Sequence, residues 1–355
     1  MMRPTLRNIA EICKVSTATV SMVLAGKGSI SAEMSSLIKR TAEELGYKRN
    51  EARKDRGPSF KYVCIIQWEE APYLWHFSQP FVLELERLLV SEGFRPLVIH
   101  KLPELNDLAL YNEIKTARAG VVFSVHYVNL TLFDQLEENG VPVILVNNSN
   151  FQDRYWSVLT DDIQGAYDGT RHLLDLGHRR IGYGEYKRSD ITSVVRDRYF
   201  GFKRALDEEN IPFPEERYIS VDLSAPDALI HLSNKLRDLI IDTPDPITAL
   251  FLHDDYFGAI VHKALLDLGL RIPEDVSLLC PGDVMDYREP FFPRLTTMQI
   301  DRPLMISISW ELLLNRLITE TSNPKVIKTK MQLIDRGSCA APKEGGNYTS
   351  EVHQI

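Results

Sequence analysis

The sequence predicts an all-α helix-turn-helix head at the N-terminus and an α/β body built from two Rossmann-like lobes with parallel sheets. Three observations support this fold class: short, capped helix patterns over residues 1–47, a hydrophilic stretch over residues 48–60, and alternating strand and helix patterns from residue 61 onward. A chain of 355 residues also exceeds what one hydrophobic core usually supports. We therefore expect two or three folding units.

The head is expected to contain three helices. The first is capped by Thr5 and runs to about residue 13, and the second follows Ser16. The third follows Ser31 and stops at Gly46, a residue type that commonly ends helices. Three short helices with a tight turn between the first two form a helix-turn-helix. The hydrophilic residues 48–60 are expected to form a hinge or linker.

The body is predicted from a repeating pattern. Strand patterns occupy residues 62–67, 95–100, 120–125 and 141–147, with helix patterns at 80–92 and 130–139. From residue 163 the pattern restarts, with helices at 163–176, 198–209, 225–241 and 256–268 and strands at 180–183, 248–253 and 276–279. Such alternation produces βαβ crossovers and parallel sheets covered by helices on both faces. Two successive sets predict two similar lobes over residues 61–340, followed by a polar, flexible tail over 341–355.

Composition excludes several classes of protein. With 44% apolar and 25% charged residues, the chain resembles ordinary globular proteins rather than disordered or fibrous ones. Its longest apolar runs have the length of a strand, and the N-terminus lacks the apolar core of a secretory signal. The four cysteines are far apart and include no CxxC pair, which argues against a zinc site or a disulfide framework. We expect a cytoplasmic protein with reduced thiols, no membrane span, no metal and no cofactor.

Charge is distributed unevenly along the chain. Residues 1–57 hold 11 Lys and Arg against 6 Asp and Glu, whereas the remainder holds 30 against 43, and the whole chain has a net charge of -8. A basic head on an acidic body favours contact between the head and a polyanion. Taken alone, this asymmetry is weak evidence, because many short basic segments are only solvated surface.

Particular positions of the head carry a resemblance to a known family. They are Thr5-Leu6, Ile9-Ala10, Val15-Ser16, Thr19-Val20-Ser21, Val23, Ser31 and Glu44-Leu45-Gly46-Tyr47. With these residues, the head resembles the DNA-binding domain of the LacI/GalR family of bacterial repressors. The resemblance implies that the second helix enters the major groove of double-stranded DNA, with hydroxyl groups and helix N-termini near phosphates. The alternative is a generic three-helix bundle in which the hydroxyl groups only cap helices.

Departures from the family's pattern affect how the head would read DNA. The residues expected to contact DNA are Thr5, Arg7, Ser16, Thr17, Ala18, Thr19, Ser21, Met22, Ser31, Asn50, Arg53, Lys54 and Arg56. Met22 stands where many relatives carry Arg, so it can offer only apolar contact, for example to a thymine methyl group. The hinge lacks the leucine that relatives insert into the minor groove. We therefore expect a site with a weakly specified, modestly bent centre, gripped at phosphates by the basic hinge; an ordinary solvated linker is the alternative.

Four blocks of the body resemble the same family. They are LLDLGHRRIGY at 173–183, RDRYFGFKRAL at 196–206, LGLRIPEDVSLL at 268–279 and PRLTTMQI at 293–300. The resemblance implies two lobes like those of periplasmic binding proteins, three crossovers between them, and an effector in the cleft. On that precedent the N-lobe spans about 61–160 and 292–322, and the C-lobe spans about 161–291 and 323–340.

The resemblance also suggests an effector site. The expected contacts are Trp68, Tyr73, Trp75, Phe77, Asp162, Arg196, Asp254 and Asp283. Arg196 matches the family's cleft arginine, and an interlobe salt bridge is its alternative role. The aromatic side chains could stack on a sugar ring or a base, or pack beneath their loop. Gly282 stands where the family has a carboxylate, which puts a typical sugar contact in doubt.

No catalytic constellation appears in the sequence. The histidines are scattered, and neither a GxSxG motif nor a nucleotide-binding glycine pattern is present. Taken with the resemblance, this predicts a transcriptional regulator rather than an enzyme: a homodimer on a pseudo-palindromic operator, controlled by a small effector such as a sugar or related metabolite. The alternative is a solute-binding protein of the same bilobed fold, which should carry a signal peptide and no basic head.

Overall fold

The computed structural model describes residues 6–15, 17–24, 32–45, 61–68, 75–102, 104–187, 193–285, 292–318 and 323–343. The chain divides into two compact units, Met1–Ser59 and Phe60–Ile355, close to the expected boundary between head and body. Within the described ranges, no helix has both the length and the apolar character needed to cross a membrane.

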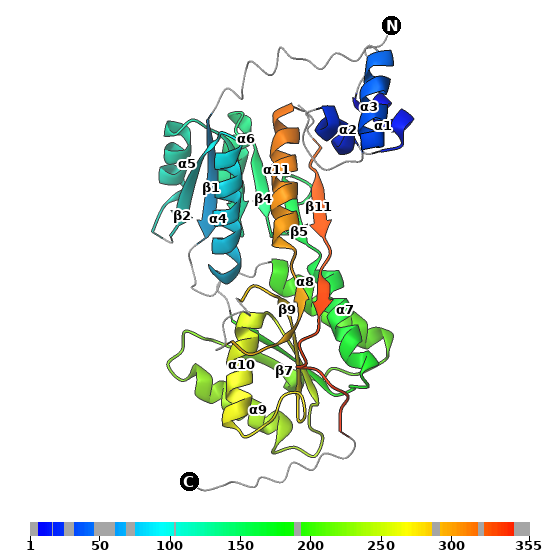
Figure 1. The fold of residues 1–355 in the computed structure, drawn as a ribbon. Coiled ribbons are helices and arrows are strands. Elements are labelled where there is room, and N and C mark those ends of the chain that lie inside the picture. Colours follow the sequence, from blue (N-terminus) through cyan, green and yellow to red (C-terminus); the bar gives the residue numbers. More distant parts are fainter. Residues whose placement is uncertain are drawn as a thin grey trace. The chain divides into compact units, whose positions relative to one another are not determined.

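The head contains the three expected helices, α1 (Leu6–Cys13), α2 (Thr17–Leu24) and α3 (Ala32–Glu44) (Figure 1). Each helix contributes one fully buried aliphatic side chain to the centre of the head: Ile9, Val20 and Ile38. Cys13, Val23 and Ala42 lie three or four residues further along the same three helices and are also buried, so each helix has an apolar face at helical spacing. This spacing is why the sequence predicted the helices closely.

The first lobe is a parallel sheet of order β11-β5-β4-β3-β1-β2. Its strands are β1 (Tyr62–Trp68), β2 (Arg95–Lys101), β3 (Ala119–Val125), β4 (Val143–Val146), β5 (Trp156–Thr160) and β11 (Val326–Thr329). Its helices are α4 (Trp75–Ser91), α5 (Asp107–Thr116), α6 (Leu130–Glu138) and α11 (Arg302–Ile318). Along β1, Val63 and Ile65 pack on the side of α4 and α11, whereas Cys64 and Ile66 pack on the side of α5 and α6. This alternation buries both faces of the sheet.

The second lobe is a sheet of order β12-β10-β9-β8-β6-β7, in which only the β10–β12 pair is antiparallel. Its strands are β6 (Ile181–Tyr186), β7 (Tyr218–Val221), β8 (Ala249–Leu252), β9 (Ser277–Gly282), β10 (Thr296–Gln299) and β12 (Gln332–Ile334). Its helices are α7 (Asp162–Asp175), α8 (Ser193–Glu208), α9 (Ala228–Ile240) and α10 (Asp255–Asp267), with a 3-10 turn, η3 (Glu215–Arg217). α7 and α8 cover one face, and α9 and α10 cover the other.

A glycine allows α7 and α8 to pack closely. A Cβ at Gly201 would lie 2.1 Å from the carbonyl oxygen of Ile163 and 2.9 Å from the Cβ of Ala166. The two helix backbones can approach this closely only because residue 201 has no side chain.

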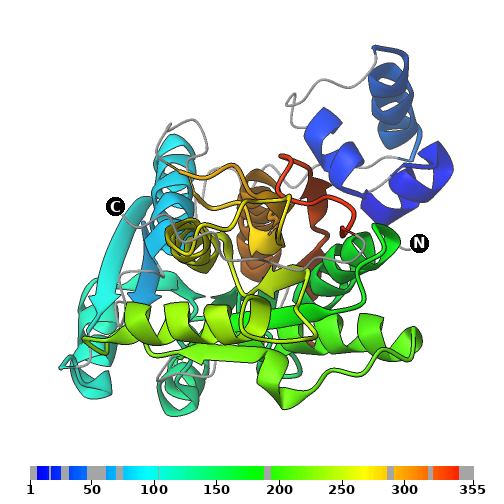
Figure 2. The ribbon, with the colours of Figure 1, turned by 90° about the horizontal axis from the view of Figure 1, so that it is seen from below.

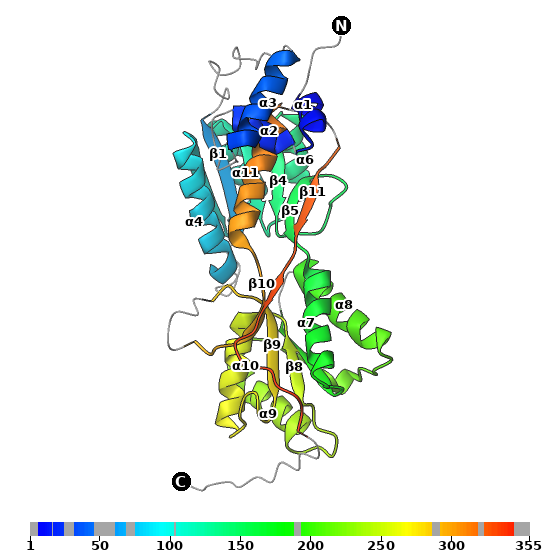
Figure 3. The ribbon, with the colours of Figure 1, turned by 45° about the vertical axis from the view of Figure 1, so that its right-hand side comes forward.

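The chain passes between the lobes three times, at 160–162, 299–302 and 329–332 (Figure 3). The expected lobe limits at 292 and 322 differ from the structure, because β10 belongs to the second sheet and β11 to the first. A strand pattern shows where a strand lies in the chain, but the sheet that it joins depends on partners far away in sequence. β11, for example, pairs with β5, about 170 residues earlier.

Several elements differ from the sequence-based expectation. α4 begins at Trp75 and contains Pro80, which had been expected to start the helix. Pro80 is the sixth residue of α4, so it lacks the N–H that would bond to the carbonyl of residue 76, and the helix continues past it without that hydrogen bond. The sequence patterns did not predict the helices α5 and α11 or the strands β5, β7, β10, β11 and β12. Each of these strands has five residues or fewer, so its pattern is short.

Candidate functional site

Buried polar side chains lie at the carboxyl ends of the first lobe's strands. The residues are at most 7% exposed, and each lies in the last two positions of β1, β2, β3 or β5 or directly after β4: Gln67, Lys101, Ser124, Asn147 and Thr160. Open α/β sheets bind ligands outside the carboxyl ends of their strands. β5 leads from this edge directly into α7 of the second lobe. This edge is therefore the candidate ligand site.

The loop after β4 is hydrogen-bonded to the second lobe. The backbone N–H of Ser149 donates to the Ser193 hydroxyl at 2.6 Å, and the Ser149 hydroxyl donates to the Asp197 carboxylate at 2.6 Å. Arg196 lies 3.5 Å from the side-chain oxygen of Asn150. These contacts connect the first lobe to the N-terminal turns of α8.

Arg196 lies at the edge of this interlobe contact. Its Nε donates to Asp197 at 3.0 Å, and one terminal nitrogen lies 3.3 Å from the Ser149 hydroxyl. The side chain is 48% exposed, so part of the guanidinium remains open to solvent. The ion pair of Arg196 is with Asp197 of the same helix, and its contacts to the first lobe are with the neutral side chains of Ser149 and Asn150, so the alternative of an interlobe salt bridge is not observed. Ligand contact by Arg196 stays a prediction.

A second arginine of α8 is buried in an ion pair. Arg198 donates from Nε to Asp162 at 2.7 Å and from a terminal nitrogen to the His253 carbonyl at 2.7 Å. Only 4% of the Arg198 side chain and 5% of the Asp162 side chain are exposed. Burial raises the pKa of the Asp162 carboxyl, and the Arg198 charge and the Thr160 hydroxyl oppose that rise. Thr160 also contacts Asn147 at 3.0 Å, so polar contacts run from β4 to the end of β8.

Sequence reasoning predicted Asp162 but missed Arg198. A usable signal lay in the helix spacing, because Arg198 precedes Gly201 by three residues and therefore shares its face. Gly201 packs against the first turn of α7, where Asp162 lies. Arg196 is two residues before Arg198 and points to nearly the opposite side of the helix.

The two carboxylates expected in the second lobe are held by groups of the protein. Asp254 caps α10 by accepting from the Phe257 N–H at 2.8 Å, and it also accepts from the Tyr186 hydroxyl at 2.6 Å. Asp283 accepts from Thr297 at 2.9 Å and Gln299 at 2.6 Å. It also forms an ion pair with Arg336 at 2.5 Å. Both carboxylates therefore already support the lobe's own structure.

Steric crowding explains why residue 282 is a glycine. Its φ is +134°, and a Cβ there would lie 2.5 Å from Oδ1 of Asp255, which is fully buried. Asp255 accepts from the backbone N–H groups of Val284 and Met285 at 2.8 and 3.0 Å. A buried carboxylate at 255 thus occupies the space that a side chain at 282 would need.

Of the four aromatic residues expected at the ligand, Phe77 packs in the core. It is 8% exposed, stacks on Phe81 at 5.9 Å and meets the His126 ring edge-on at 5.3 Å. The Phe77 ring is therefore mostly buried against other side chains of the protein, as expected from the alternative in which the aromatic residues pack rather than contact a ligand. Trp68 lies in β1 and Trp75 lies in α4, but the structure describes only the backbone of these two residues. Tyr73 lies outside the described residues.

Most of the expected DNA contacts fall on residues whose side chains are not described. Thr19 is half-buried in α2. Arg7, Thr17, Ala18, Ser21 and Met22 lie in α1 and α2, but only their backbone is described. Outside the described residues lie Thr5, Ser16, Ser31, Asn50, Arg53, Lys54 and Arg56. These contacts stay predictions.

Two family models match the chain. Residues 5–50 match the model described as bacterial regulatory proteins, lacI family, and residues 170–339 match a periplasmic binding protein-like domain. The chain belongs to the LacI family of bacterial regulatory proteins. This LacI-family protein is a DNA-binding transcriptional regulator, and its body is of the kind that binds an effector.

Curated relatives are similar over almost the whole chain. The HTH-type transcriptional repressor PurR of Yersinia pestis bv. Antiqua (strain Antiqua) is 26% identical over 348 residues, which cover 95% of this chain and 97% of the relative. PurR of Yersinia pseudotuberculosis serotype O:1b (strain IP 31758) is 25% identical with the same coverage. These relatives are transcriptional regulators.

Solved structures show the same fold. The CelR–cellobiose complex, a transcriptional regulator, has a TM-score of 0.65 at 25% identity, covering 95% of this chain and 100% of that chain. The lac repressor dimer bound to operator and the anti-inducer ONPF has a TM-score of 0.65 at 21% identity, with coverages of 96% and 100%. A LacI-family regulator from Enterococcus faecium with bound ribose has a TM-score of 0.65 at 22% identity, covering 80% and 100%.

Proposed function

We propose that this LacI-family regulator is a cytoplasmic, non-enzymatic repressor that binds a pseudo-palindromic operator as a homodimer. A small effector bound between the lobes changes its affinity for DNA. The observation that carries the proposal is the joining of a lacI-type head, residues 5–50, to a body with two sheets and three crossovers. Lobes joined in this way can change their closure when a ligand binds at their facing edges.

A sugar or related metabolite is the proposed effector. Solved structures of similar fold hold cellobiose, ribose and glucose. In this chain, Asp162, Arg196, Asp254 and Asp283 lie near the carboxyl ends of strands, the position that suits ligand contact. Because Asp162, Asp254 and Asp283 already have partners, we propose Arg196, with its half-exposed guanidinium, as the main ligand contact of this set.

Exposed apolar residues on the body support dimerisation. Leu83 and Val90 lie on α4, and Leu229 and Ile230 lie at the start of α9, each at least 47% exposed. Exposed aliphatic residues that recur on neighbouring turns suit burial against a second copy. A dimer would present two heads to two half-sites.

The whole chain is expected to select a pseudo-palindromic DNA site and to be a dimer at micromolar concentration. Selection of bound sequences from random DNA, combined with light scattering, tests both points. Because the hinge lacks an inserted leucine, we expect a weakly specified centre between two specified half-sites. A monomer that still binds one DNA sequence specifically, or a strongly preferred central CG step with a large bend, would contradict this proposal.

Arg196→Ala is expected to abolish the response to effector while leaving folding and apo DNA affinity near normal. A thermal-shift screen of sugars and nucleosides first identifies the compound that stabilises the body most. Calorimetry with that compound then compares the variant with Arg204→Ala, a control on the same helix that removes an exposed pair with Glu208. Unchanged affinity in Arg196→Ala would show that the ligand binds elsewhere.

A further inference from the structure

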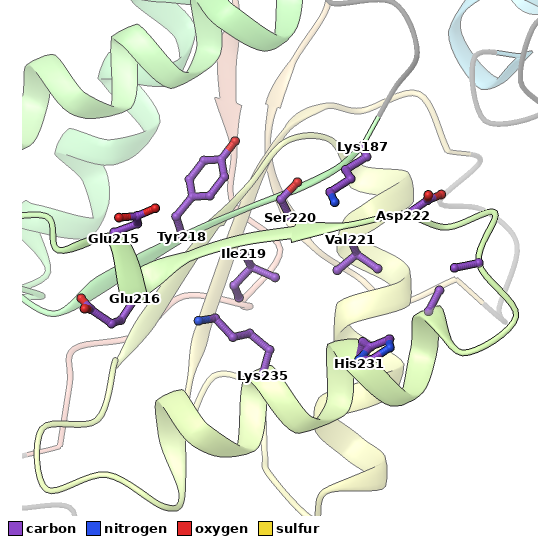
Figure 4. A pocket seen from close by; sticks show the side chains of 12 residues that line it. Lys187, Glu215, Glu216, Tyr218, Ile219, Ser220, Val221, Asp222, His231 and Lys235 are labelled. Carbon is purple, nitrogen blue, oxygen red and sulfur yellow. The ribbon is translucent and has the colours of Figure 1, made fainter.

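A groove runs along the outer edge of the second sheet, on the far side of β7 from β6. Its volume is about 710 Å³, within the range of sites that hold small ligands. Figure 4 shows the groove between β7 and α9, with side chains from both elements lining it. Figure 2 shows the second lobe from below, with α9 running beside the sheet.

β7 is an edge strand with one unpaired side. It pairs with β6 in parallel, and no other strand of the described chain pairs with its outer edge. The N–H of Lys187 donates to the Val221 carbonyl at 2.7 Å, so the backbone groups of Val221 face β6. Backbone groups alternate in direction along a strand. The N–H and C=O of Ser220 therefore face the groove.

The side chains beside the strand suit an extended segment. Ile219 and Val221 are buried and form an apolar wall toward α9, whereas the Ser220 side chain is exposed. Four residues of strand extend over roughly 13 Å. The groove thus offers backbone hydrogen bonds and an apolar wall over the length of a short peptide.

The charges of the groove set the chemistry of its occupant. Glu215 and Glu216 stand at the amino end of β7, and Lys235 of α9 lines the groove near the same end (Figure 4), so this end carries two negative charges and one positive charge. None of these three side chains forms a hydrogen bond or an ion pair with another described residue. At the carboxyl end, Lys187 lies near Asp222, which also accepts from Ser224. The acidic amino end is therefore available for a basic side chain of the occupant, and the other end is nearly neutral.

We propose that this groove binds an extended peptide of a partner protein, which adds to β7 as an antiparallel strand. A basic residue at the C-terminal end of the peptide would lie near Glu215 and Glu216. A second copy of this chain fits less well, because antiparallel pairing of two β7 strands would place the nearly neutral end of one copy, with Lys187 and Asp222, beside Glu215 and Glu216 of the other, and so would supply no net positive charge there. The protein would thus carry a protein-binding site separate from its DNA-binding head and from the edge that faces the first lobe.

The probe is an acetylated and amidated pentapeptide, Thr-Val-Thr-Val-Lys, with Thr-Val-Thr-Val-Glu as its charge-reversed control. Calorimetry on the full chain is expected to give a dissociation constant on the order of 0.1–1 mM for the lysine peptide, since a short flexible ligand loses conformational freedom on binding. The glutamate peptide should bind at least several-fold more weakly. Hydrogen exchange over 217–223 should slow when the lysine peptide is present.

Ser220→Pro removes the outward N–H and leaves the hydrogen bonds to β6 in place, which an edge strand tolerates. Ser220→Ala keeps that N–H and is the matched control. The proline variant should bind the lysine peptide about tenfold more weakly than the alanine variant. Glu215→Lys with Glu216→Lys should reverse the preference between the two peptides.

Three results would overturn the proposal. They are equal binding of both peptides, equal binding by the two Ser220 variants, and no slowing of exchange over 217–223. Concentration-dependent association of the chain that Ser220→Pro abolishes would show instead that a second copy occupies the edge.

Discussion

Arg198→Ala is expected to lower the free energy of unfolding of the body by about 3–5 kcal/mol, the range for removing one partner of a buried ion pair. The change leaves the Asp162 carboxylate, 5% exposed, without the guanidinium that lies 2.7 Å away. It also leaves the His253 carbonyl without its donor from Arg198. Urea unfolding followed by tryptophan fluorescence measures the loss, because Trp68, Trp75, Trp156 and Trp310 all lie in the body.

Two variants serve as controls for this measurement. Arg196→Ala lies on the same helix but removes a half-exposed side chain, so it should cost less than about 1 kcal/mol. The double variant Asp162→Leu with Arg198→Met removes both charges and should be less destabilised than Arg198→Ala. Similar losses for Arg198→Ala and Arg196→Ala would contradict the burial of the Asp162–Arg198 pair.

Local patterns predicted the head and most elements of the body. For each of the three head helices, a residue type that favours caps and the apolar positions lie within a few residues of one another in the sequence, so each helix is specified by its own sequence. The alternation of strands and helices likewise predicted two parallel-sheet lobes. β7 was missed because it has four residues, one of them an exposed serine, and gains its stability from its parallel pairing with β6.

Long-range pairing explains one of the two wrong lobe limits. β11 lies beside β5, about 170 residues earlier, whereas β10 lies beside β9, the strand that precedes it in the chain. Either strand could have completed either sheet on its local pattern, because both are short. Which sheet each strand joins depends on the apolar faces that the neighbouring strands and helices expose to it.

Only part of the geometry of the candidate site could be predicted from the sequence, because that geometry also depends on contacts between distant residues. The motif match pointed to Arg196, and the structure places it at the contact between Ser149 and α8. Which arginine of α8 is buried depends on the approach of Gly201 to α7, a tertiary contact. The structural roles of Asp254 and Asp283 likewise follow from Tyr186 and Arg336, which are distant in sequence.

Acidification is expected to destabilise the body through His178. Burial lowers the pKa of this histidine to about 4, against a weaker opposing effect of its hydrogen bond with the Ala340 carbonyl; His172 and Arg179 lower it slightly further. In the unfolded chain its pKa is about 6.5. Below about pH 6.5, His178 therefore binds a proton in the unfolded state. In the folded state it binds that proton only when the pH falls to about 4. The body should lose up to about 3 kcal/mol of stability from this residue as pH falls across that window, and nothing from it above pH 7.

The contacts of His178 show why its neutral form is preferred. Nε2 lies 2.9 Å from the Ala340 carbonyl, which can only accept, so Nε2 carries the proton of the neutral ring. Nδ1 lies 2.8 Å from the Thr248 hydroxyl and accepts from it. Protonation would place a charge in a site where 1% of the residue is exposed.

His178→Gln removes the titration, so the difference in unfolding free energy between wild type and variant should shift by up to about 3 kcal/mol between pH 7 and pH 4. Urea unfolding at several pH values measures this shift, and a difference that stays constant with pH would mean that His178 titrates normally in the folded body.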